Sequence, residues 1–142
     1  MTFEYAPAPE SKSIVKLDKE YGNFINGKFV KGKKHFATIN PATEEVLSHV
    51  ANGDKSDIDK AVQAAQVAYT KVWSKLSGAE RGKYLYRIAR ILQERAREFA
   101  VLETMDNGKP IRETRDIDIP LVSAHFFYHA GWADKLDYAG VG

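Results

Sequence analysis

The chain has 142 residues, of which 44% are hydrophobic and 28% are charged, as is typical of one globular domain or of part of a larger one. Its 21 basic and 19 acidic residues give a net charge of +2, so we expect neither a nucleic acid nor a membrane as partner. The absence of cysteine excludes disulfides, thiolate nucleophiles and cysteine-ligated metals within these residues. A polar start and the lack of a long apolar run predict a cytoplasmic protein without a secretory signal.

The first third of the chain predicts an arm followed by strands. Residues 1–20 are polar with two early prolines, so we expect an extended leader or arm. Residues 21–52 are predicted to form short antiparallel strands. In "FINGKFV", Asn26 and Gly27 separate two apolar pairs, which predicts a tight hairpin with positive φ at both central residues. "HFATIN" alternates like a strand that Pro41 ends, because proline has no N–H for the ladder.

A helical period replaces the strands over residues 53–139. Ser56 and Asp59 fit a capping pattern in front of a predicted helix over 56–73. Apolar residues recur along this helix at three- and four-residue spacing, with many alanines, which predicts close packing against a neighbour. The residues of this stripe are Ile58, Ala61, Val62, Ala65, Tyr69 and Val72.

Two more amphipathic helices are predicted after the first. One covers 79–105, opens on the capping pair Ser77 and Glu80, and ends at Gly108, a residue suited to the left-handed conformation. The other covers 119–136, after a separate short helix that is considered at "IRETRD". The residues alone therefore predict an α+β, mainly helical chain, in which a short antiparallel β-hairpin region precedes three amphipathic helices.

Several short motifs have ordinary structural interpretations. His125 and His129 are spaced to share a helix face, but no third metal ligand is nearby, so we interpret them as a partly buried structural pair. Asp116 and Asp118 are interpreted as surface acids, and Asp118 also as the N-cap of the third helix. Residues 140–142, Gly-Val-Gly, lack the third glycine and the helix of a phosphate-binding loop. No catalytic and no cofactor-binding residue is predicted.

A family resemblance gives these elements a function. "ETMDNGKPIRETRDIDIP" resembles the N-terminal part of NAD(P)-dependent aldehyde dehydrogenases, and "FINGKFV", "INPATEEVLSHVA" and "HFFYHAGWADKL" resemble other landmarks of that family in the same order. The resemblance covers residues 21–142. It implies that the parent enzyme oxidises an aldehyde to a carboxylic acid with NAD or NADP. It also implies that the cysteine nucleophile, the glutamate base and the oxyanion hole lie downstream of the matched region.

The resemblance implies that this chain is an N-terminal segment of an oxidoreductase, inactive alone, whose helices pack beside a cofactor domain that starts at residues 140–142. Its expected partners are the remainder of the enzyme and further copies in a homo-oligomer, and no cofactor is expected to bind the chain alone. Some family members hold a monovalent cation through a carboxylate and backbone carbonyls. The matching positions are Asp106, Thr38 and Ile39; otherwise Asp106 is an ordinary carboxylate at a helix end.

One alternative stays open beside the enzyme segment. The same amphipathic helices and the missing nucleophile are compatible with a free-standing, non-catalytic helical module for interaction or oligomerisation. Binding of NAD by this chain alone is disfavoured, because no phosphate-binding glycine loop is complete.

Overall fold

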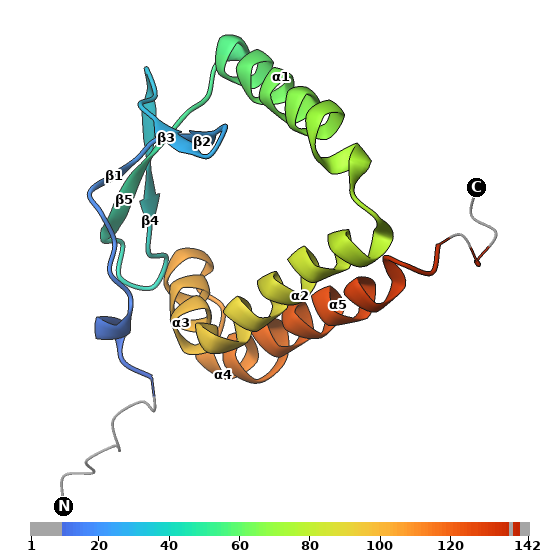
Figure 1. The fold of residues 1–142 in the computed structure, drawn as a ribbon. Coiled ribbons are helices and arrows are strands. Elements are labelled where there is room, and N and C mark those ends of the chain that lie inside the picture. The colour runs from blue at the N-terminus through green and yellow to red at the C-terminus, as the bar shows by residue number, and fades with distance from the viewer. Residues whose placement is uncertain (1–9, 137, 140–142) are drawn as a thin grey trace, which may run out of the picture.

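The computed structural model describes residues 10–136 and 138–139, so the first nine residues and the expected start of a cofactor domain lie outside the described part. The elements in chain order are η1 (Lys12–Ile14), β1 (Glu20–Tyr21), β2 (Asn23–Ile25), β3 (Lys28–Val30), β4 (His35–Ile39), β5 (Val46–Ala51), α1 (Lys55–Lys71), η2 (Trp73–Lys75), α2 (Gly78–Glu94), α3 (Ala96–Asn107), α4 (Ile111–Glu113), η3 (Thr114–Asp118) and α5 (Ile119–Trp132). Figure 1 shows the strands and α1 as one part and the helices α2 to α5 as a second part, arranged around an open centre. The predicted fold class, a small β region followed by amphipathic helices, is confirmed.

The predicted hairpin forms where the sequence indicates. β2 and β3 pair antiparallel, and the two residues between them, Asn26 and Gly27, have φ values of 52° and 76°. Phe24 and Phe29 are cross-strand partners whose ring centroids lie 5.1 Å apart. A two-residue loop with positive φ at both positions matches the right-handed twist of the strands, which explains why this short hairpin closes.

The other strands form a three-stranded sheet in the order β1-β5-β4. β4 and β5 are antiparallel, but β1 runs parallel to β5, so the prediction of antiparallel strands throughout was wrong for β1. The hairpin and β4 lie between β1 and β5 in the chain, and this connection is long enough to return the chain to the same end of the sheet. β4 is an edge strand, and its pairing shifts register between Thr38 and Ile39.

The first helix is capped two residues earlier than predicted. Asp54 is the N-cap of α1: its carboxylate accepts the Asp57 backbone N–H at 3.0 Å, and the Asp57 carboxylate accepts the Asp54 N–H at 3.2 Å. Lys33 donates to Asp54 at 2.7 Å, and this hydrogen bond lowers the pKa of the Asp54 carboxyl below its ordinary value. The reciprocal pair satisfies two N–H groups that a helix otherwise leaves unbonded. Ser56 therefore lies inside the helix.

The predicted helix over 79–105 is two helices. α2 begins with the expected reciprocal cap, in which Ser77 and Glu80 bond to each other's backbone N–H. Arg95, at φ −105° and ψ 18°, ends α2, and α3 starts at the next residue. Arg95 forms two hydrogen bonds with Glu98, 2.8 and 2.6 Å long, which bring its side chain onto the new helix. α3 ends at Gly108 with φ 77°, as predicted.

The short helix considered at "IRETRD" and the predicted last helix are one continuous helix. α4, η3 and α5 follow one another without a break, and η3 is a π-helical turn in which the Ile119 N–H donates to the Thr114 carbonyl. Asp118 has helical φ and ψ and makes no capping bond, so it is not an N-cap. Pro120 cannot donate to the carbonyl of residue 116. The wider π turn directly before the proline lets the helix continue in spite of that missing bond.

The buried core is small. α2 packs against α5 more extensively than any other pair of helices. A Cβ added to Gly78 would lie 2.2 Å from the Ala133 carbonyl oxygen, so this crossing depends on glycine. The buried hydrophobic residues of the described chain are Ala51, Ala89, Ala100, Val101, Ile119 and Ala130. None of these residues is larger than isoleucine, and many large apolar side chains of the described chain remain exposed. No helix in the described ranges has the length and apolar content needed to cross a bilayer.

Candidate functional site

The described chain brings the end of β4 against the end of α3. Gly108 closes α3, and a Cβ on Gly108 would lie 2.7 Å from Pro41 Cγ, which follows β4 by two residues. A cavity of about 250 Å³ lies at this joint, and it is lined by Asn40 and Thr43 from the sheet side and by Met105 from α3. The segment "DNGKP", which carries the family resemblance, therefore lies where the helical part of the molecule contacts the sheet.

The three predicted cation ligands lie on the two sides of this joint. Thr38 and Ile39 end β4, and Asp106 lies in the last turn of α3 with an exposed side chain. Pro41 and Gly108, which lie two residues from Ile39 and Asp106, are the residues in contact. A register shift on an edge strand frees backbone groups from the ladder, so carbonyl oxygens at Thr38 and Ile39 can bond outside the sheet.

The available donors suit a hard cation. A carboxylate and two backbone carbonyls are oxygen ligands, which alkali and alkaline-earth ions prefer over nitrogen or sulfur. Within the described residues there is no cluster of three or more His, Cys, Asp or Glu side chains that could hold a metal. A site of this kind differs from such a cluster because most of its ligands would be backbone oxygens.

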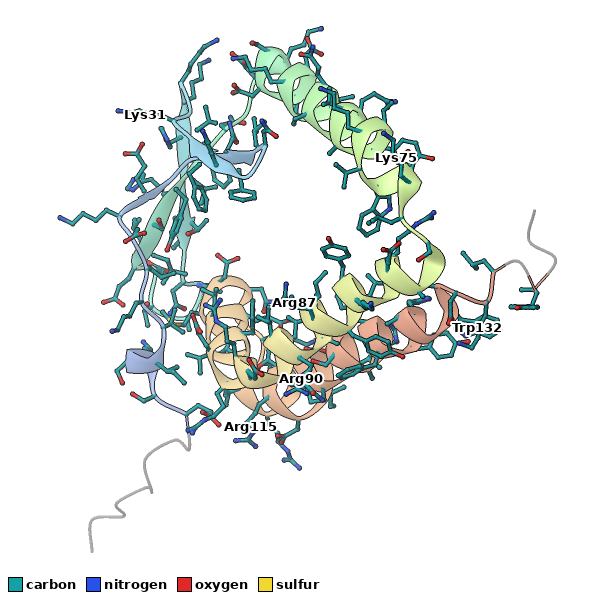
Figure 2. The ribbon with its side chains drawn as sticks, in the orientation of Figure 1. Lys31, Lys75, Arg87, Arg90, Arg115 and Trp132 are labelled. Carbon is teal, nitrogen blue, oxygen red and sulfur yellow. The ribbon has the colours of Figure 1, made fainter. Side chains whose placement is uncertain are left out.

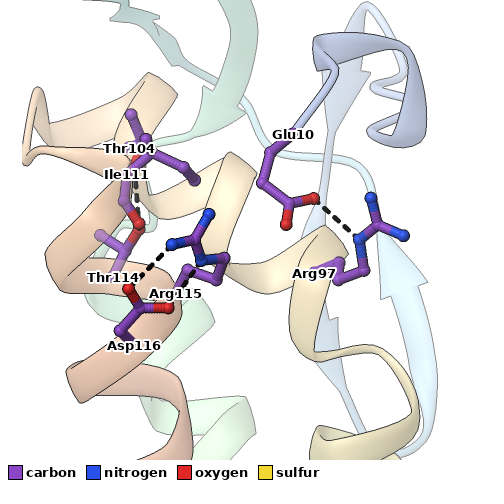
Figure 3. A network of polar contacts seen from close by, with 7 residues as sticks. All are labelled: Glu10, Arg97, Thr104, Ile111, Thr114, Arg115 and Asp116. Carbon is purple, nitrogen blue, oxygen red and sulfur yellow. Dashed lines mark hydrogen bonds and ion pairs between the residues drawn. The ribbon is translucent and has the colours of Figure 1, made fainter. Parts of the chain in front are cut away.

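Polar contacts fix the turn between α3 and α4 (Figure 3). The Thr104 and Thr114 hydroxyls are 2.9 Å apart, and Thr114, which is fully buried, also donates to the Ile111 carbonyl at 3.2 Å. On the other side of the turn Lys109 donates to Asp118, and this hydrogen bond raises the pKa of Lys109 above its ordinary value. These contacts hold α3 and η3 side by side. The sequence did not predict the contact between the two threonines, because residues ten positions apart carry no periodic signal.

The adjacent acids are engaged separately. Asp116 accepts two hydrogen bonds from Arg115, at 2.6 and 2.8 Å, and these lower the pKa of the Asp116 carboxyl. Asp118 is paired with Lys109 instead. Two carboxylates with different cationic partners do not form an acid–base pair around one substrate. Asp116 is exposed, as predicted, whereas Asp118 is half-buried.

The histidine pair is not buried. His125 and His129 are both exposed on α5, so their interpretation as a partly buried structural pair was wrong for the described chain. The ring centroid of His129 lies 5.3 Å from that of Tyr128, which in turn lies 6.3 Å from Trp132. Trp132 projects from the outer side of α5 in Figure 2. The pair therefore belongs to an exposed aromatic face.

The apolar stripe of α1 is also exposed. Ile58 and Val62 are 58% and 62% exposed, and Tyr69 and Val72 are 56% exposed. α1 contacts little beyond η2 and the hairpin strand β2. Close packing of this stripe against a neighbour was predicted, and the described chain does not provide that neighbour. Large apolar side chains exposed along one face of a helix are typical of a surface that packs against another protein surface.

Comparison with known proteins decides which family the chain belongs to. The sequence profile described as "Aldehyde dehydrogenase family" matches residues 29–141 of the chain. The chain belongs to the aldehyde dehydrogenase family. That match includes both sides of the joint, from β4 to the end of α5.

Relatives of the aldehyde dehydrogenase family agree in sequence and in structure. The chain is 45% identical over 115 residues to the mitochondrial aldehyde dehydrogenase family 2 member B4 of Arabidopsis thaliana, and 43% identical over 133 residues to the mitochondrial aldehyde dehydrogenase of Rattus norvegicus. These alignments cover 79% and 91% of this chain but only 21% and 25% of the relatives. The NAD+ complex of an aldehyde dehydrogenase from Bacillus cereus superposes with a TM-score of 0.77 and 39% identity, over 83% of this chain and 26% of that chain. The chain thus spans about a quarter of the length of these relatives.

Proposed function

We propose that this chain supplies the N-terminal quarter of an NAD(P)-dependent aldehyde dehydrogenase and is not catalytic by itself. The observation that carries the proposal is the exposed apolar stripe of α1 in a chain that spans about a quarter of its relatives. Removing apolar surface from water is favourable by roughly 25 cal/mol per Å². The large apolar side chains that the chain leaves exposed therefore favour a contact with the remaining three quarters of the enzyme. The nucleophile and the nicotinamide site would belong to that remainder.

The proposal includes the organisation of the segment. Residues 21–52 would form the strand region and residues 53–139 the helices that pack beside the cofactor domain. NAD or NADP would bind the assembled enzyme, as the Bacillus cereus relative does with NAD+. Assembly into a homo-oligomer and a cytoplasmic location complete the proposal. Size measurement of the purified enzyme and microscopy of a tagged chain would test these last two points.

We also propose that Asp106 and the carbonyls of Thr38 and Ile39 contribute to a monovalent-cation site at the joint. The edge position of β4, its register shift and the contact between Pro41 and Gly108 support this assignment. A bound cation would supply positive charge between β4 and α3. The chain's own part would be to hold three oxygens at fixed positions on the two elements.

A chimera tests the enzymatic proposal. The segment of the Bacillus cereus enzyme that matches this chain is replaced by residues 21–139, and NAD-dependent aldehyde oxidation is measured beside the unmodified enzyme. We expect a folded, active chimera, because the segment would present the surfaces that the remainder needs. A chimera that does not assemble, or that assembles without activity, would contradict the proposal. Tight binding of the isolated chain to an unrelated protein, together with an inactive chimera, would favour the interaction module instead.

A further inference from the structure

The arm in front of β1, residues 10–19, connects the sheet to the helices. At its far end Ser48 of β5 donates its hydroxyl to the Asp18 carbonyl at 2.8 Å. At its near end the Glu10 carboxylate accepts a hydrogen bond of 2.8 Å from Arg97 of α3. The arm is therefore bonded to both parts of the molecule, and it crosses the joint described above.

Glu10 is the buried partner in this contact. Its side chain is 7% exposed, whereas that of Arg97 is 65% exposed. Arg115 lies on its other side (Figure 3). The pKa of Arg115 is raised first by its hydrogen bond to Asp116, and Glu10 makes a smaller contribution of the same sign. A carboxylate this buried is costly to leave without a hydrogen-bond donor, so the contact with Arg97 favours the arm staying on α3.

The arm joins α3, which carries one proposed cation ligand, to the sheet whose strand β4 carries the other two. Asp106 lies on α3, the helix that Glu10 contacts. Thr38 and Ile39 lie on β4, which pairs along its length with β5, the strand that holds the other end of the arm. Glu10 also lines the 250 Å³ cavity at the joint, together with residues of α3 and of the loop that follows β4. A change at Glu10 therefore alters how firmly the sheet is held against α3.

We propose that Glu10 is a positioning residue for the monovalent-cation site: its ion pair with Arg97 holds α3 against the sheet, and so limits how far Asp106 can move relative to the β4 carbonyls. This inference rests on the cation site proposed above. Glu10 does not touch the ion, and it acts through the relative position of two elements. Ligands that are held in place before the ion binds lose less conformational entropy on binding, so the affinity for the ion is higher.

The experiment measures potassium binding to the chimera extended to include residues 10–139. Thermal unfolding is recorded while KCl replaces tetramethylammonium chloride at constant ionic strength, which gives an apparent Kd for K+ from the shift in Tm. Glu10→Gln removes the charge, and Glu10→Asp retains it on a shorter side chain. Glu94→Gln is the matched control, because Glu94 forms an exposed ion pair with Arg90 on α2 and lies outside the joint.

We expect Glu10→Gln to raise the Kd for K+ by about tenfold, Glu10→Asp to raise it less, and Glu94→Gln to leave it unchanged. NAD-dependent activity at saturating K+ should be retained in all three variants. Potassium affinity that is equal in Glu10→Gln and the parent chimera would overturn the positioning role. A parent chimera that is active but shows no K+-specific shift would overturn the cation site, and with it this inference, while the family assignment would stand. If Glu10→Gln does not fold, the comparison of Glu10→Asp with Glu94→Gln decides the same question.

Discussion

The crossing of α2 and α5 gives a prediction with a magnitude that follows from the geometry. A Cβ on Gly78 would lie 2.2 Å from the Ala133 carbonyl oxygen and 2.9 Å from the Asp134 Cα. Both atoms belong to the backbone, so no side-chain rotation relieves the overlap, and the two helices must move apart by about 1 Å to reach ordinary contact. Overpacking of this kind costs about 1–3 kcal/mol, whereas the gain in helix propensity from alanine is below about 1 kcal/mol. We expect Gly78→Ala to lower the free energy of unfolding by about 2 kcal/mol.

The assay is urea unfolding of the 142-residue chain, followed by circular dichroism at 222 nm. Gly131→Ala is the matched control, because the nearest atom to its added Cβ is the Tyr86 hydroxyl at 3.7 Å, an ordinary contact. Since Gly131 lies inside α5, its replacement should raise the free energy of unfolding by about 0.5–1 kcal/mol. Equal stability of Gly78→Ala and wild type, or a larger loss for Gly131→Ala, would refute the close crossing of α2 and α5.

Three further predictions concern a buried hydroxyl, an ion pair and the exposed stripe of α1. The buried Ser123 hydroxyl has no hydrogen-bond partner among the described residues, so Ser123→Ala should be neutral or stabilising by up to about 1 kcal/mol in the same urea assay. A clear loss of stability would contradict this prediction. The hydrogen bond from the Lys33 ammonium holds the pKa of the Asp54 carboxyl below its ordinary 3.8 in the folded chain. The ionised Asp54 therefore stabilises the fold fully above pH 3.8, and this stabilisation is lost as the pH falls through the lower folded pKa. Asp54→Asn should remove this loss, so the free energy of unfolding should fall less steeply at acidic pH. The isolated chain should bind anilinonaphthalene sulfonate, and replacing both Ile58 and Val62 by Glu should reduce the fluorescence, whereas unchanged fluorescence would place the dye elsewhere.

Local backbone chemistry made part of the fold predictable from the sequence. The hairpin follows from Asn26 and Gly27, because few other residues adopt positive φ at two successive positions. The reciprocal cap at Ser77 and the end of α3 at Gly108 depend on residues next to each other in the chain, and both were predicted. Such features need no knowledge of tertiary contacts.

Features that depend on distant contacts were missed. Arg95 breaks the predicted long helix without glycine or proline, and the apolar spacing continues across the break. Pro120 suggested a helix start by the local rule, yet Thr114, buried against Thr104, lies in a continuous helix that begins at Ile111, eight residues before the predicted start at 119. The two-residue strand β1 is too short to have a pattern of its own.

The candidate site was predictable only through the family resemblance. Backbone carbonyl ligands such as those proposed at Thr38 and Ile39 leave no mark in the sequence, because any residue type can supply them. The arm contact from Glu10 to Arg97 joins residues 87 apart, a separation at which periodicity carries no information. The α1 stripe was found from its spacing, but its exposure in this chain was visible only in the structure.

Amide hydrogen exchange of α1 tests the central claim most directly. The exchange of peptides from Lys55 to Lys71 is measured by mass spectrometry in the isolated chain and in the chimera with the Bacillus cereus enzyme. If the remainder of the enzyme covers the apolar stripe, opening of α1 becomes costlier, and its amides should exchange at least tenfold more slowly in the chimera. Equal exchange of α1 in the two proteins would contradict the claim that its apolar stripe packs against the remainder of an aldehyde dehydrogenase.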